Sequence, residues 1–406
     1  TDECGSPYAG LSAFAGNASL LDGGASGALE RFEALERNTV FRYSYQEFCK
    51  KNAYWLEPYA VFRALKDTFG GDVAWQDWPE EYRSYTPELA ARAGVREGAE
   101  RRRRIQFMFE REWHELRDYA HKHGVQIIGD MPMFVSADSA DVWAHPEIFD
   151  LDAEGRIASQ PGTPPDSFAP EGQLWGNPAY RWDVLKQQGY AWWMQRFERS
   201  FDLYDYTRLD HFLGFISYYD IPSGHTAADG SDLFGPGLDL FQEAHRRFGE
   251  LPFIAEDLGS VTPAVRALLA ETGIPGMSVA VFADGDPREH FVAPPETVLY
   301  TSTHDTSTLA GHIKRRFTFP DTEDAAVNGL ADEKTLELFN AVVEHVLSVP
   351  NDVAILPLQD VLGLDDSARM NVPGTCKDNW VWRCPPELLT HDAAEKLRAL
   401  ARRGAR

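Results

Sequence analysis

The chain has 406 residues, of which 43% are apolar and 12% aromatic, a composition typical of a globular protein. Its 63 acidic and 39 basic residues give a formal net charge of −24, and such a surface repels phosphate backbones and anionic lipids. We therefore expect no nucleic-acid partner and no membrane partner. Four scattered cysteines without a CxxC pair, and a first segment without the features of a secretory signal, predict a reduced, cytoplasmic protein.

The first third of the chain reads as loop and helix. Residues 1–22 are rich in Gly, Ser and Ala, which predicts a structured loop. Short amphipathic pieces at 46–110 predict an inserted helical subdomain, broken at Pro58, Pro79 and Pro87. A longer helix is expected over 98–122, with Phe109 and Leu116 among its periodic apolar positions and Gly124 as its stop. The arginine run at 101–104 lies among acids, which indicates a solvated face with ion pairs.

Beyond Gly124, short apolar, β-branched runs alternate with helix-like stretches. The predicted strands are Val125–Ile128, Tyr206–Leu209, Phe253–Ala255, Ser278–Phe282, Val298–Thr301 and Val353–Leu356. The predicted helices are 183–203, 239–249, 262–272, 308–317 and 331–348. This alternation is typical of a parallel sheet covered by helices.

Polar residues follow the predicted strands. They are Gly129-Asp130, Asp210-His211, Glu256-Asp257, His304-Asp305 and Gln359-Asp360. Barrels of the (β/α)8 type carry their catalysis at the carboxyl ends of the strands, as does a doubly wound sheet. The sequence has no GxGxxG after a strand, and an acidic rim repels a dinucleotide, so we predict a single α/β domain over 1–406, a (β/α)8 TIM-type barrel. Six strands rather than eight leave two explanations: two more strands in the first hundred residues, or a missing N-terminal piece.

A second insertion is predicted at 141–182. The segment is long and polar and contains six prolines together with Trp143, Trp175, Tyr180 and Trp182. Prolines stiffen a loop, and aromatic side chains give it flat surfaces. A long ordered loop on the catalytic face of a barrel usually binds substrate, so we expect a substrate-covering loop here.

Asp210, Glu256 and Asp305 follow three predicted strands at equivalent positions. Taken singly, each is more often a helix cap or a loop hydrogen-bond acceptor. Taken together, in apolar flanks, they are able to supply a nucleophile, a general acid/base and a third carboxylate. Retaining glycoside chemistry requires two carboxyls about 5 Å apart. Neighbouring strands lie about 4.8 Å apart, which Asp210 and Glu256 on consecutive strands would match.

Arg208 lies two residues before Asp210, so both side chains should point to one face of the strand. The guanidinium would keep Asp210 ionised; a structural ion pair is the alternative. His211 and His304 adjoin carboxylates and either donate to sugar hydroxyls or pack in the core. The histidines form no metal-ligand set, so we expect no catalytic metal and no cofactor. The sequence contains neither a GxSxG elbow nor a GxxxxGK[ST] loop.

Long motifs make the chain resemble the amylomaltases, or 4-α-glucanotransferases, of the α-amylase superfamily. The motifs are SPYAGLSAFAGN (6–17), IIGDMPMFVSADSADVWAHPEIF (127–149), GTPPDSFAPEGQLWGNPAYRWD (162–183), RLDHFLGF (208–215), IAEDLGSVTP (254–263), PGMSV (275–279), TSTHD (301–305), LPLQDVLGL (356–364), ARMNVPGT (368–375) and NWVWR (379–383). The family usually has a basic residue where this chain has Leu213 and Ser278. Its members also carry about two strands ahead of the SPY segment, so the resemblance predicts a barrel that lacks its first one or two strands.

The resemblance implies an α-retaining double displacement between malto-oligosaccharides or starch-derived glucans as donors and glucose or a glucan as acceptor. Asp210 would be the nucleophile and Glu256 the acid/base, while Asp305 with His304 would hold the 2- and 3-hydroxyls of the sugar. The other implied site residues are Arg208 beside the nucleophile, Asp130 and Tyr8 at the donor subsite, and Gln173, Trp175 and Asn177 in the covering loop. The alternative is a non-catalytic or weakly hydrolytic glucan-binding remnant.

Overall fold

The computed structural model describes residues 32–33, 35–165, 170–283, 290–316, 333–375 and 377–403. The chain divides into two compact units, Thr1–Pro252 and Phe253–Arg406. The loop predicted over 1–22, with Tyr8, lies outside the described residues. Within the described part, none of the helices combines the length and the apolar character that crossing a membrane requires.

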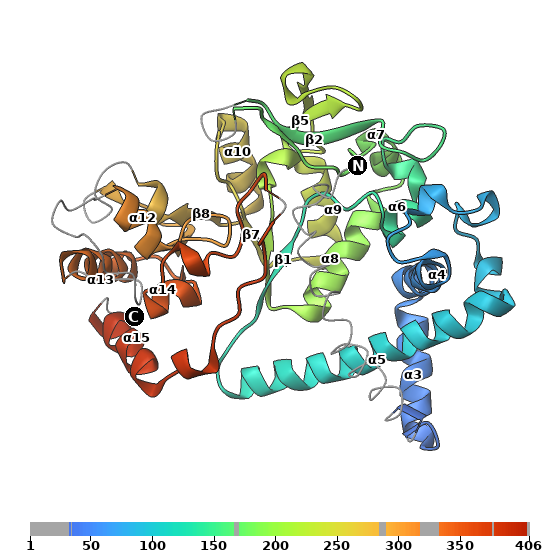
Figure 1. Cartoon of the computed structure of the whole chain (residues 1–406), viewed down its shortest axis with the longest axis horizontal. Helices are drawn as coiled ribbons and strands as arrows, with labels where there is room; N and C mark the ends of the chain where they lie inside the picture. The colour runs from blue at the N-terminus through green and yellow to red at the C-terminus, as the bar shows by residue number, and fades with distance from the viewer. Residues whose placement is uncertain are drawn as a thin grey trace. The chain divides into compact units, whose positions relative to one another are not determined.

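The first unit begins with the expected helices. They are α3 (Thr39–Lys51), α4 (Ala53–Phe69), α5 (Ala93–Lys122) and three 3-10 turns at Trp75–Asp77, Glu80–Tyr82 and Pro87–Ala91. Helices α4 and α5 pack against each other (Figure 1). Pro58 was predicted to break a helix, but it lies buried inside α4, which continues past it. Burial of Leu56, Val61 and Leu65 on the same helix offsets the backbone hydrogen bond that proline removes.

The long helix α5 begins earlier than predicted, and its buried face matches the predicted one only in part. Phe107 and Met108 are buried, while Phe109 and Leu116, predicted on the apolar side, are 47% and 52% exposed. Phe107 packs in an aromatic cluster with Phe32, Phe41 and Phe48. Spacing alone does not decide which apolar arc faces the core when a helix carries apolar residues on both sides.

The arginine run on α5 forms the predicted ion pairs. Arg102 pairs with Asp67 at 2.6 Å, Arg103 with Glu57 at 2.8 Å, and Arg104 with Glu100 at 3.0 Å. These pairs tie α5 to α4 and to its own preceding turn. The ion pairs are present as the sequence indicates, but the face is not solvated as predicted, because the side chains of Arg102, Arg103 and Arg104 are only 23%, 13% and 22% exposed.

A parallel pair of strands carries the predicted site residues of the first unit. Strand β1 (Ile128–Met131) pairs with β4 (Tyr206–Leu209), with Asp130 opposite Arg208. Along the chain, α7 (Trp182–Gln187) and α8 (Ala191–Leu203) come between these two strands, and α9 (Leu238–Phe248) comes after them. Strand β1 begins three residues later than predicted, because the Val125 N–H donates to the Ala120 carbonyl and so still closes the last turn of α5.

A second sheet in this unit was not predicted. Strands β2 (Ser159–Thr163), β3 (Gln173–Leu174), β5 (Ser217–Pro222) and β6 (Ser231–Phe234) form an antiparallel sheet in the order β3-β2-β5-β6. The insertion predicted at 141–182 contains two of these strands, together with most of α6 (Ala140–Ala144) and a 3-10 turn at Pro146–Ile148. Further 3-10 turns lie at Phe212–Phe215 and Ala227–Asp229.

The second unit continues the predicted alternation. Its elements are β7 (Phe253–Ala255), α10 (Pro263–Thr272), β8 (Gly276–Val279), β9 (Thr297–Tyr300), α12 (Leu309–Arg316), α13 (Glu333–Ser348), β10 (Ala354–Ile355), α14 (Leu358–Leu362) and α15 (His391–Arg403), with 3-10 turns at Ala280–Phe282, Asp366–Ala368 and Pro386–Leu388. Strands β8, β9 and β10 form a parallel sheet in the order β10-β9-β8, and the Ala255 N–H of β7 donates to the Pro275 carbonyl ahead of β8.

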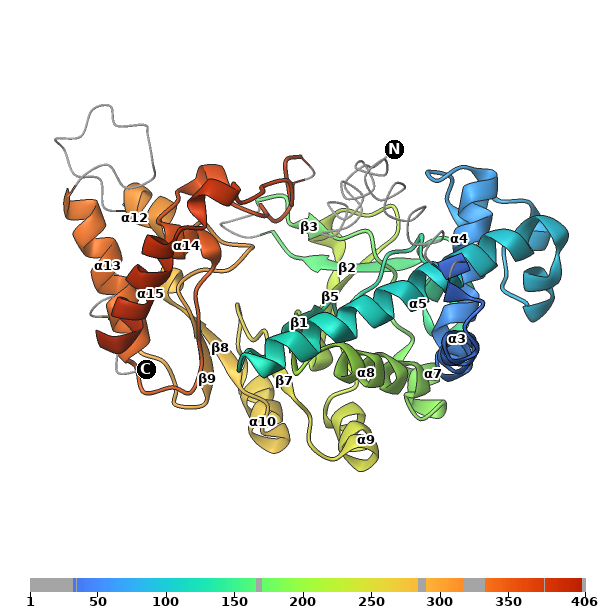
Figure 2. The same ribbon diagram turned by 90° about the horizontal axis from the view of Figure 1, so that it is seen from below.

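Helices α12 and α15 both pack against α13 in this unit (Figure 2). The core contains Leu299 of β9, Val342 and Val346 of α13, and Leu400 of α15, all buried. All six predicted strands are thus present within three residues of their expected positions, and the fold is mixed α/β. Closure of the strands into a barrel stays a prediction.

Candidate active site

Asp130, Arg208 and Asp210 meet at the carboxyl ends of β1 and β4. Arg208 Nη1 donates to both carboxylate oxygens of Asp130, at 2.9 and 3.0 Å, and to Asp210 Oδ1 at 3.1 Å. The Arg208 side chain is only 9% exposed, whereas that of Asp210 is 28% exposed. The predicted proximity of Arg208 and Asp210 is confirmed. One buried guanidinium thus orients two carboxylates, and Asp210 keeps an exposed portion.

His211 is held next to Asp210 in an unusual backbone conformation. Its φ of 49° is left-handed, which is uncommon for a residue other than glycine. Its ring lies 4.9 Å from the Trp175 ring at a perpendicular angle and 6.3 Å from the Phe134 ring. Burial lowers the pKa of His211 to about 4. The ring is therefore neutral at pH 7 and belongs to an aromatic cluster.

This depressed pKa predicts a pH-dependent loss of stability. An unfolded histidine has a pKa of about 6.5, so the unfolded state binds the extra proton as the pH falls from about 6.5 toward 4. We expect the free energy of unfolding of the wild type to fall more between pH 7 and pH 5 than that of His211→Asn, because Asn tolerates the left-handed backbone and does not titrate. Urea unfolding at both pH values measures this. Equal decreases in the two proteins would contradict it.

The predicted residues of the 141–182 segment lie in the same unit. Trp175 Nε1 donates to Gln173 Oε1 at 3.2 Å, and the Trp175 backbone N–H donates to the Pro161 carbonyl at 3.2 Å. Asn177 is 3% exposed, and its Oδ1 has no hydrogen-bond partner among the described residues. Through the Trp175–His211 ring contact, the segment reaches the immediate neighbour of Asp210.

His304 and Asp305 lie in the loop after β9. His304 Nε2 is 3.1 Å from Asp305 Oδ2, and Asn371 Nδ2 donates to Asp305 Oδ1 at 2.5 Å. Arg369 Nη2 donates to the Asp305 carbonyl at 2.6 Å, and the Trp380 ring lies 5.2 Å from the His304 ring. Both carboxylate oxygens of Asp305 are therefore engaged, and its backbone is anchored as well.

Asn371, Arg369 and Trp380 are contacts that our sequence reasoning missed. They lie in the ARMNVPGT and NWVWR segments, which carry part of the family resemblance but follow no predicted strand. The signal that could have found them is their membership in those motifs. The pattern of acids at strand ends does not include Asn371, because Asn371 is an amide that follows no predicted strand.

Glu256 and Asp257 follow β7 directly, and the structure shows a structural contact for Asp257. The Asp257 carboxylate accepts the Met277 backbone N–H at 2.7 Å, and burial raises its pKa. Asp257 therefore anchors the start of β8. Glu256 is the acid of this pair that we retain as the acid/base candidate.

The predicted residues fall into two groups. Asp130, Gln173, Trp175, Asn177, Arg208 and Asp210 belong to the first unit, while Glu256, His304 and Asp305 belong to the second. Convergence of Asp210 with Glu256 and Asp305 stays a prediction, and Tyr8 lies outside the described residues. Among the described residues, no three His, Cys, Asp or Glu side chains lie close enough together to hold a metal ion.

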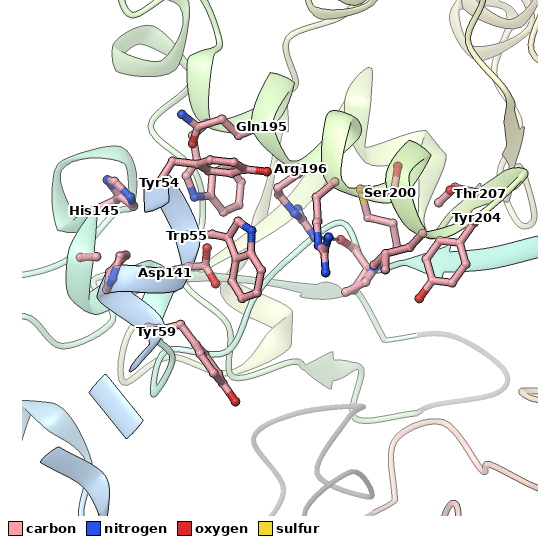
Figure 3. Close-up of a pocket in the computed structure, with 18 of the residues that line it drawn as sticks. Tyr54, Trp55, Tyr59, Asp141, His145, Gln195, Arg196, Ser200, Tyr204 and Thr207 are labelled. Atoms are coloured by element: carbon pink, nitrogen blue, oxygen red, sulfur yellow. Dashed lines mark hydrogen bonds between the residues drawn. The ribbon is translucent and has the colours of Figure 1, made fainter. Parts of the chain in front are cut away.

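A cavity of about 320 Å³ lies in the first unit among α4, α6 and α8. Tyr54 and Trp55 of α4 approach Gln195 and Arg196 of α8 across it (Figure 3). Arg196 is already engaged, since its guanidinium donates to the Pro132 carbonyl at 2.7 Å and to the Met133 carbonyl at 3.3 Å. Of the predicted site residues that the structure describes, Asp130 alone lines this cavity.

Comparison with known proteins identifies relatives of the chain over most of its length. The model of glycoside hydrolase family 77, described as 4-alpha-glucanotransferase, matches residues 25–390. A 4-alpha-glucanotransferase of Thermus thermophilus is 38% identical over 98% of this chain and 88% of its own length. The chloroplastic/amyloplastic 4-alpha-glucanotransferase of Solanum tuberosum is 39% identical over 82% of this chain and 58% of its own length.

Two solved structures resemble the chain as well. Amylomaltase from Streptococcus agalactiae in complex with acarbose matches with a TM-score of 0.83 and 31% identity, over 94% of this chain and 78% of that one. Amylomaltase from Corynebacterium glutamicum matches with a TM-score of 0.69 and 20% identity, over 94% of this chain and 58% of that one, which supports the fold alone. The chain belongs to the 4-α-glucanotransferase family.

Proposed function

We propose that the chain transfers α-1,4-glucan segments between malto-oligosaccharides through a covalent glycosyl-enzyme. The donors are malto-oligosaccharides or starch-derived glucans, and the acceptor is glucose or another glucan. The family membership and the 38% identity to the Thermus thermophilus enzyme support the reaction. The observation that carries the assignment to this chain's residues is the Asp130–Arg208–Asp210 cluster, which presents an oriented carboxylate at the end of a strand.

The first half of the proposed reaction forms the intermediate. An Asp210 carboxylate oxygen attacks the anomeric carbon of the donor, while Glu256 gives its proton to the departing glycosidic oxygen. The bond between the anomeric carbon and that oxygen breaks, and an ester to Asp210 with β configuration forms. Arg208 keeps the attacking oxygen in place without becoming part of the new bond.

The second half returns the enzyme to its starting state. The Glu256 carboxylate takes the proton from the 4-hydroxyl of the acceptor glucan, and that oxygen attacks the anomeric carbon. The ester to Asp210 breaks, which restores its carboxylate and leaves Glu256 protonated. Two inversions give net retention of the α configuration.

Asp305 would bind the 2- and 3-hydroxyls of the sugar at the cleavage point. Hydrogen bonds to the 2-hydroxyl strengthen in the transition state of glycoside cleavage. The contacts of Asn371 and His304 with the two Asp305 oxygens hold that carboxylate in one orientation. A carboxylate held in a fixed orientation stabilises the transition state without first having to reorient, which lowers the activation barrier of the glycoside cleavage.

Transfer requires the site to exclude water. The intermediate partitions between water at about 55 M and a sugar acceptor at millimolar concentration, so the acceptor must be preorganised by several kcal/mol. The aromatic, proline-containing segment 141–182 is our candidate for the element that covers the site. Trp175, packed on His211 beside Asp210, supports this assignment.

We further propose that the six predicted strands form part of a (β/α)8 TIM-type barrel of one catalytic domain, with 46–110 and 141–182 as insertions. Parallel pairing of β1 with β4, of β8 with β9, and of β9 with β10 supports a barrel. In such a barrel, the acids that follow β4, β7 and β9 would converge at one mouth. The cytoplasm is the location that we propose, from the sparse cysteines.

Incubation with maltotriose tests the proposed function. We expect free glucose together with a ladder of longer malto-oligosaccharides, because each transferred segment extends an acceptor. Formation of only glucose and maltose would assign the chain to hydrolysis. Binding of maltotriose without any product would assign it to a non-catalytic glucan-binding protein. Chromatography of the oligosaccharides distinguishes the three outcomes.

Replacing Arg208 should reduce transfer. In Arg208→Leu the carboxylates of Asp130 and Asp210 lose their shared cation, so we expect kcat to fall by about 10²-fold through misplacement of the nucleophile. Arg103→Leu is the matched control, because Arg103 is also mostly buried and bonded to acids, Glu57 and Glu100. We expect the control to lose stability and to keep its kcat. Equal kcat in both variants would show that Arg208 has only a structural role.

A further inference from the structure

Asp360, at the start of α14, is a buried carboxylate with three donors. Asp360 is only 1% exposed. Oδ2 accepts the hydroxyls of Thr301 and Ser302, each at 2.6 Å, and Oδ1 accepts the Leu309 backbone N–H at 2.8 Å. Thr301 and Ser302 are themselves 0% and 1% exposed. The contacts therefore lie wholly inside the second unit, away from competing water.

The three donors flank one loop. Thr301 and Ser302 follow the end of β9, and Leu309 is the first residue of α12. Residues 303–308 connect them, and this short loop contains His304 and Asp305. One carboxylate thus closes both ends of the loop that presents the two predicted site residues.

Contacts within the loop complete its geometry. The Thr303 backbone N–H donates to Thr306 Oγ1 at 2.9 Å, and the Asp305 backbone N–H donates to Thr303 Oγ1 at 3.3 Å. The Thr308 N–H donates to Asp366 Oδ1 at 3.0 Å. With its ends fixed by Asp360, the loop has little freedom to move Asp305 away from Asn371.

Holding a strand end with a buried carboxylate costs more free energy than holding it with a neutral group. Burial opposes ionisation and raises the pKa of Asp360, while its three hydrogen bonds favour the charged form. The other end of β9 is held by a neutral side chain: Asn351 Nδ2 donates to the Pro294 carbonyl at 2.7 Å and to the Thr297 carbonyl at 2.8 Å. A neutral amide therefore holds the end of β9 that is remote from Asp305, whereas a carboxylate with two acceptor oxygens holds the end of β9 that is near Asp305.

We propose that Asp360 is a positioning residue for the His304–Asp305 pair and acts on glucan transfer through the loop 303–308. This inference rests on the proposed function, in which Asp305 binds the sugar at the cleavage point. Asp360 touches neither substrate nor reacting atoms in this account. Its role is to keep the Asp305 carboxylate where a transition-state contact requires it.

Asp360→Asn is the direct test, with Asn351→Ala as the matched control at the other end of β9. The Asn variant keeps an acceptor for Leu309 but replaces Oδ2 with an NH2 group, which faces the Thr301 and Ser302 hydroxyls that formerly donated. We expect kcat with maltotriose to fall by roughly 10- to 100-fold while KM changes less than about 3-fold, since a loose Asp305 weakens the transition state more than the ground state. We expect Asn351→Ala to lower the unfolding midpoint and to leave kcat within about 2-fold.

A double-mutant cycle separates positioning from a general structural role. If Asp360 acts through Asp305, adding Asp360→Asn to Asp305→Ala should lower the residual kcat by less than about 2-fold, because the effects are not additive. A full additive loss would overturn the proposal. Hydrogen exchange gives an independent readout: faster exchange confined to peptides that contain 303–308 is expected in Asp360→Asn, and unchanged exchange there would also overturn it.

Ser302→Ala provides a milder variant if Asp360→Asn does not fold. It removes one donor and leaves the carboxylate bonded to Thr301 and Leu309, so we expect a smaller drop in kcat, of about 3- to 10-fold, in the same direction. A wild-type kcat in this variant would contradict the proposal. Absence of transfer by the wild type would instead refute the proposed function, and the hydrogen-exchange result would still report whether Asp360 holds the loop.

Discussion

Asp210→Asn should abolish glucan transfer, with kcat lowered by about 10⁴-fold or more, because the amide is not able to form the ester intermediate. The variant keeps the size of the side chain, and Asn Oδ1 remains able to accept the Arg208 hydrogen bond seen at 3.1 Å. We therefore expect folding to be preserved. Steady-state assays with maltotriose, at enzyme concentrations high enough to detect the residual rate, measure the effect.

Asp205→Asn is the control for this result. Asp205 lies just before β4, while Asp210 lies just after it, so the two variants change opposite ends of one strand. Asp205 accepts the Ile127 N–H and bonds Arg117 and His121, contacts that outweigh the effect of burial and lower its pKa to about 2. We expect this variant to lose stability and to keep kcat within a few-fold. A residual kcat above about 1% in Asp210→Asn would exclude Asp210 as the nucleophile.

Glu256→Gln should show a loss that depends on the leaving group. With maltotriose as donor we expect kcat to fall by about 10²- to 10⁴-fold, because neither departure of the glycosidic oxygen nor activation of the acceptor is assisted. With α-maltosyl fluoride the first step needs no proton, since fluoride leaves as an anion. The intermediate should then form quickly and break down slowly, so intact-protein mass spectrometry should show a maltosyl adduct.

The neighbouring Asp257→Asn variant controls for damage to the strand end. Its carboxylate anchors Met277 at the start of β8, so we expect reduced stability and no dependence on the leaving group. Equal losses of kcat for maltotriose and maltosyl fluoride in Glu256→Gln, without an adduct, would refute the acid/base role. The same experiment thus separates a chemical effect from a structural one.

Strands of the parallel type were predictable from this sequence because burial on both faces leaves a continuous apolar run. Phe253–Ala255 is such a run and matches the structure at both ends, and Tyr206–Leu209 also matches although it contains Thr207 and Arg208. The antiparallel sheet was not predictable, because β6 is exposed along its length and β2 contains Ser, Gln, Pro and Gly. Such strands form through pairing with β5 and carry no periodic signal of their own.

The contacts of the candidate site were likewise predictable from the sequence only in part. The contact between Arg208 and Asp210 follows from the two-residue period of a strand, and the structure contains it. The Asn371–Asp305 hydrogen bond joins residues 66 positions apart, and no local pattern encodes it. Asp360 was noticed only as an acid after a strand; its bonds to Thr301 and Leu309 depend on how α14 packs beside β9.

Identification of the residue that carries the trapped sugar tests the central claim most directly. Glu256→Gln incubated with α-maltosyl fluoride, quenched in acid and digested with pepsin, should yield one peptide heavier by a maltosyl group. We predict that fragmentation places the added mass on Asp210. Attachment to any other carboxylate, or a protein that turns over maltotriose while never accumulating an adduct, would contradict the account.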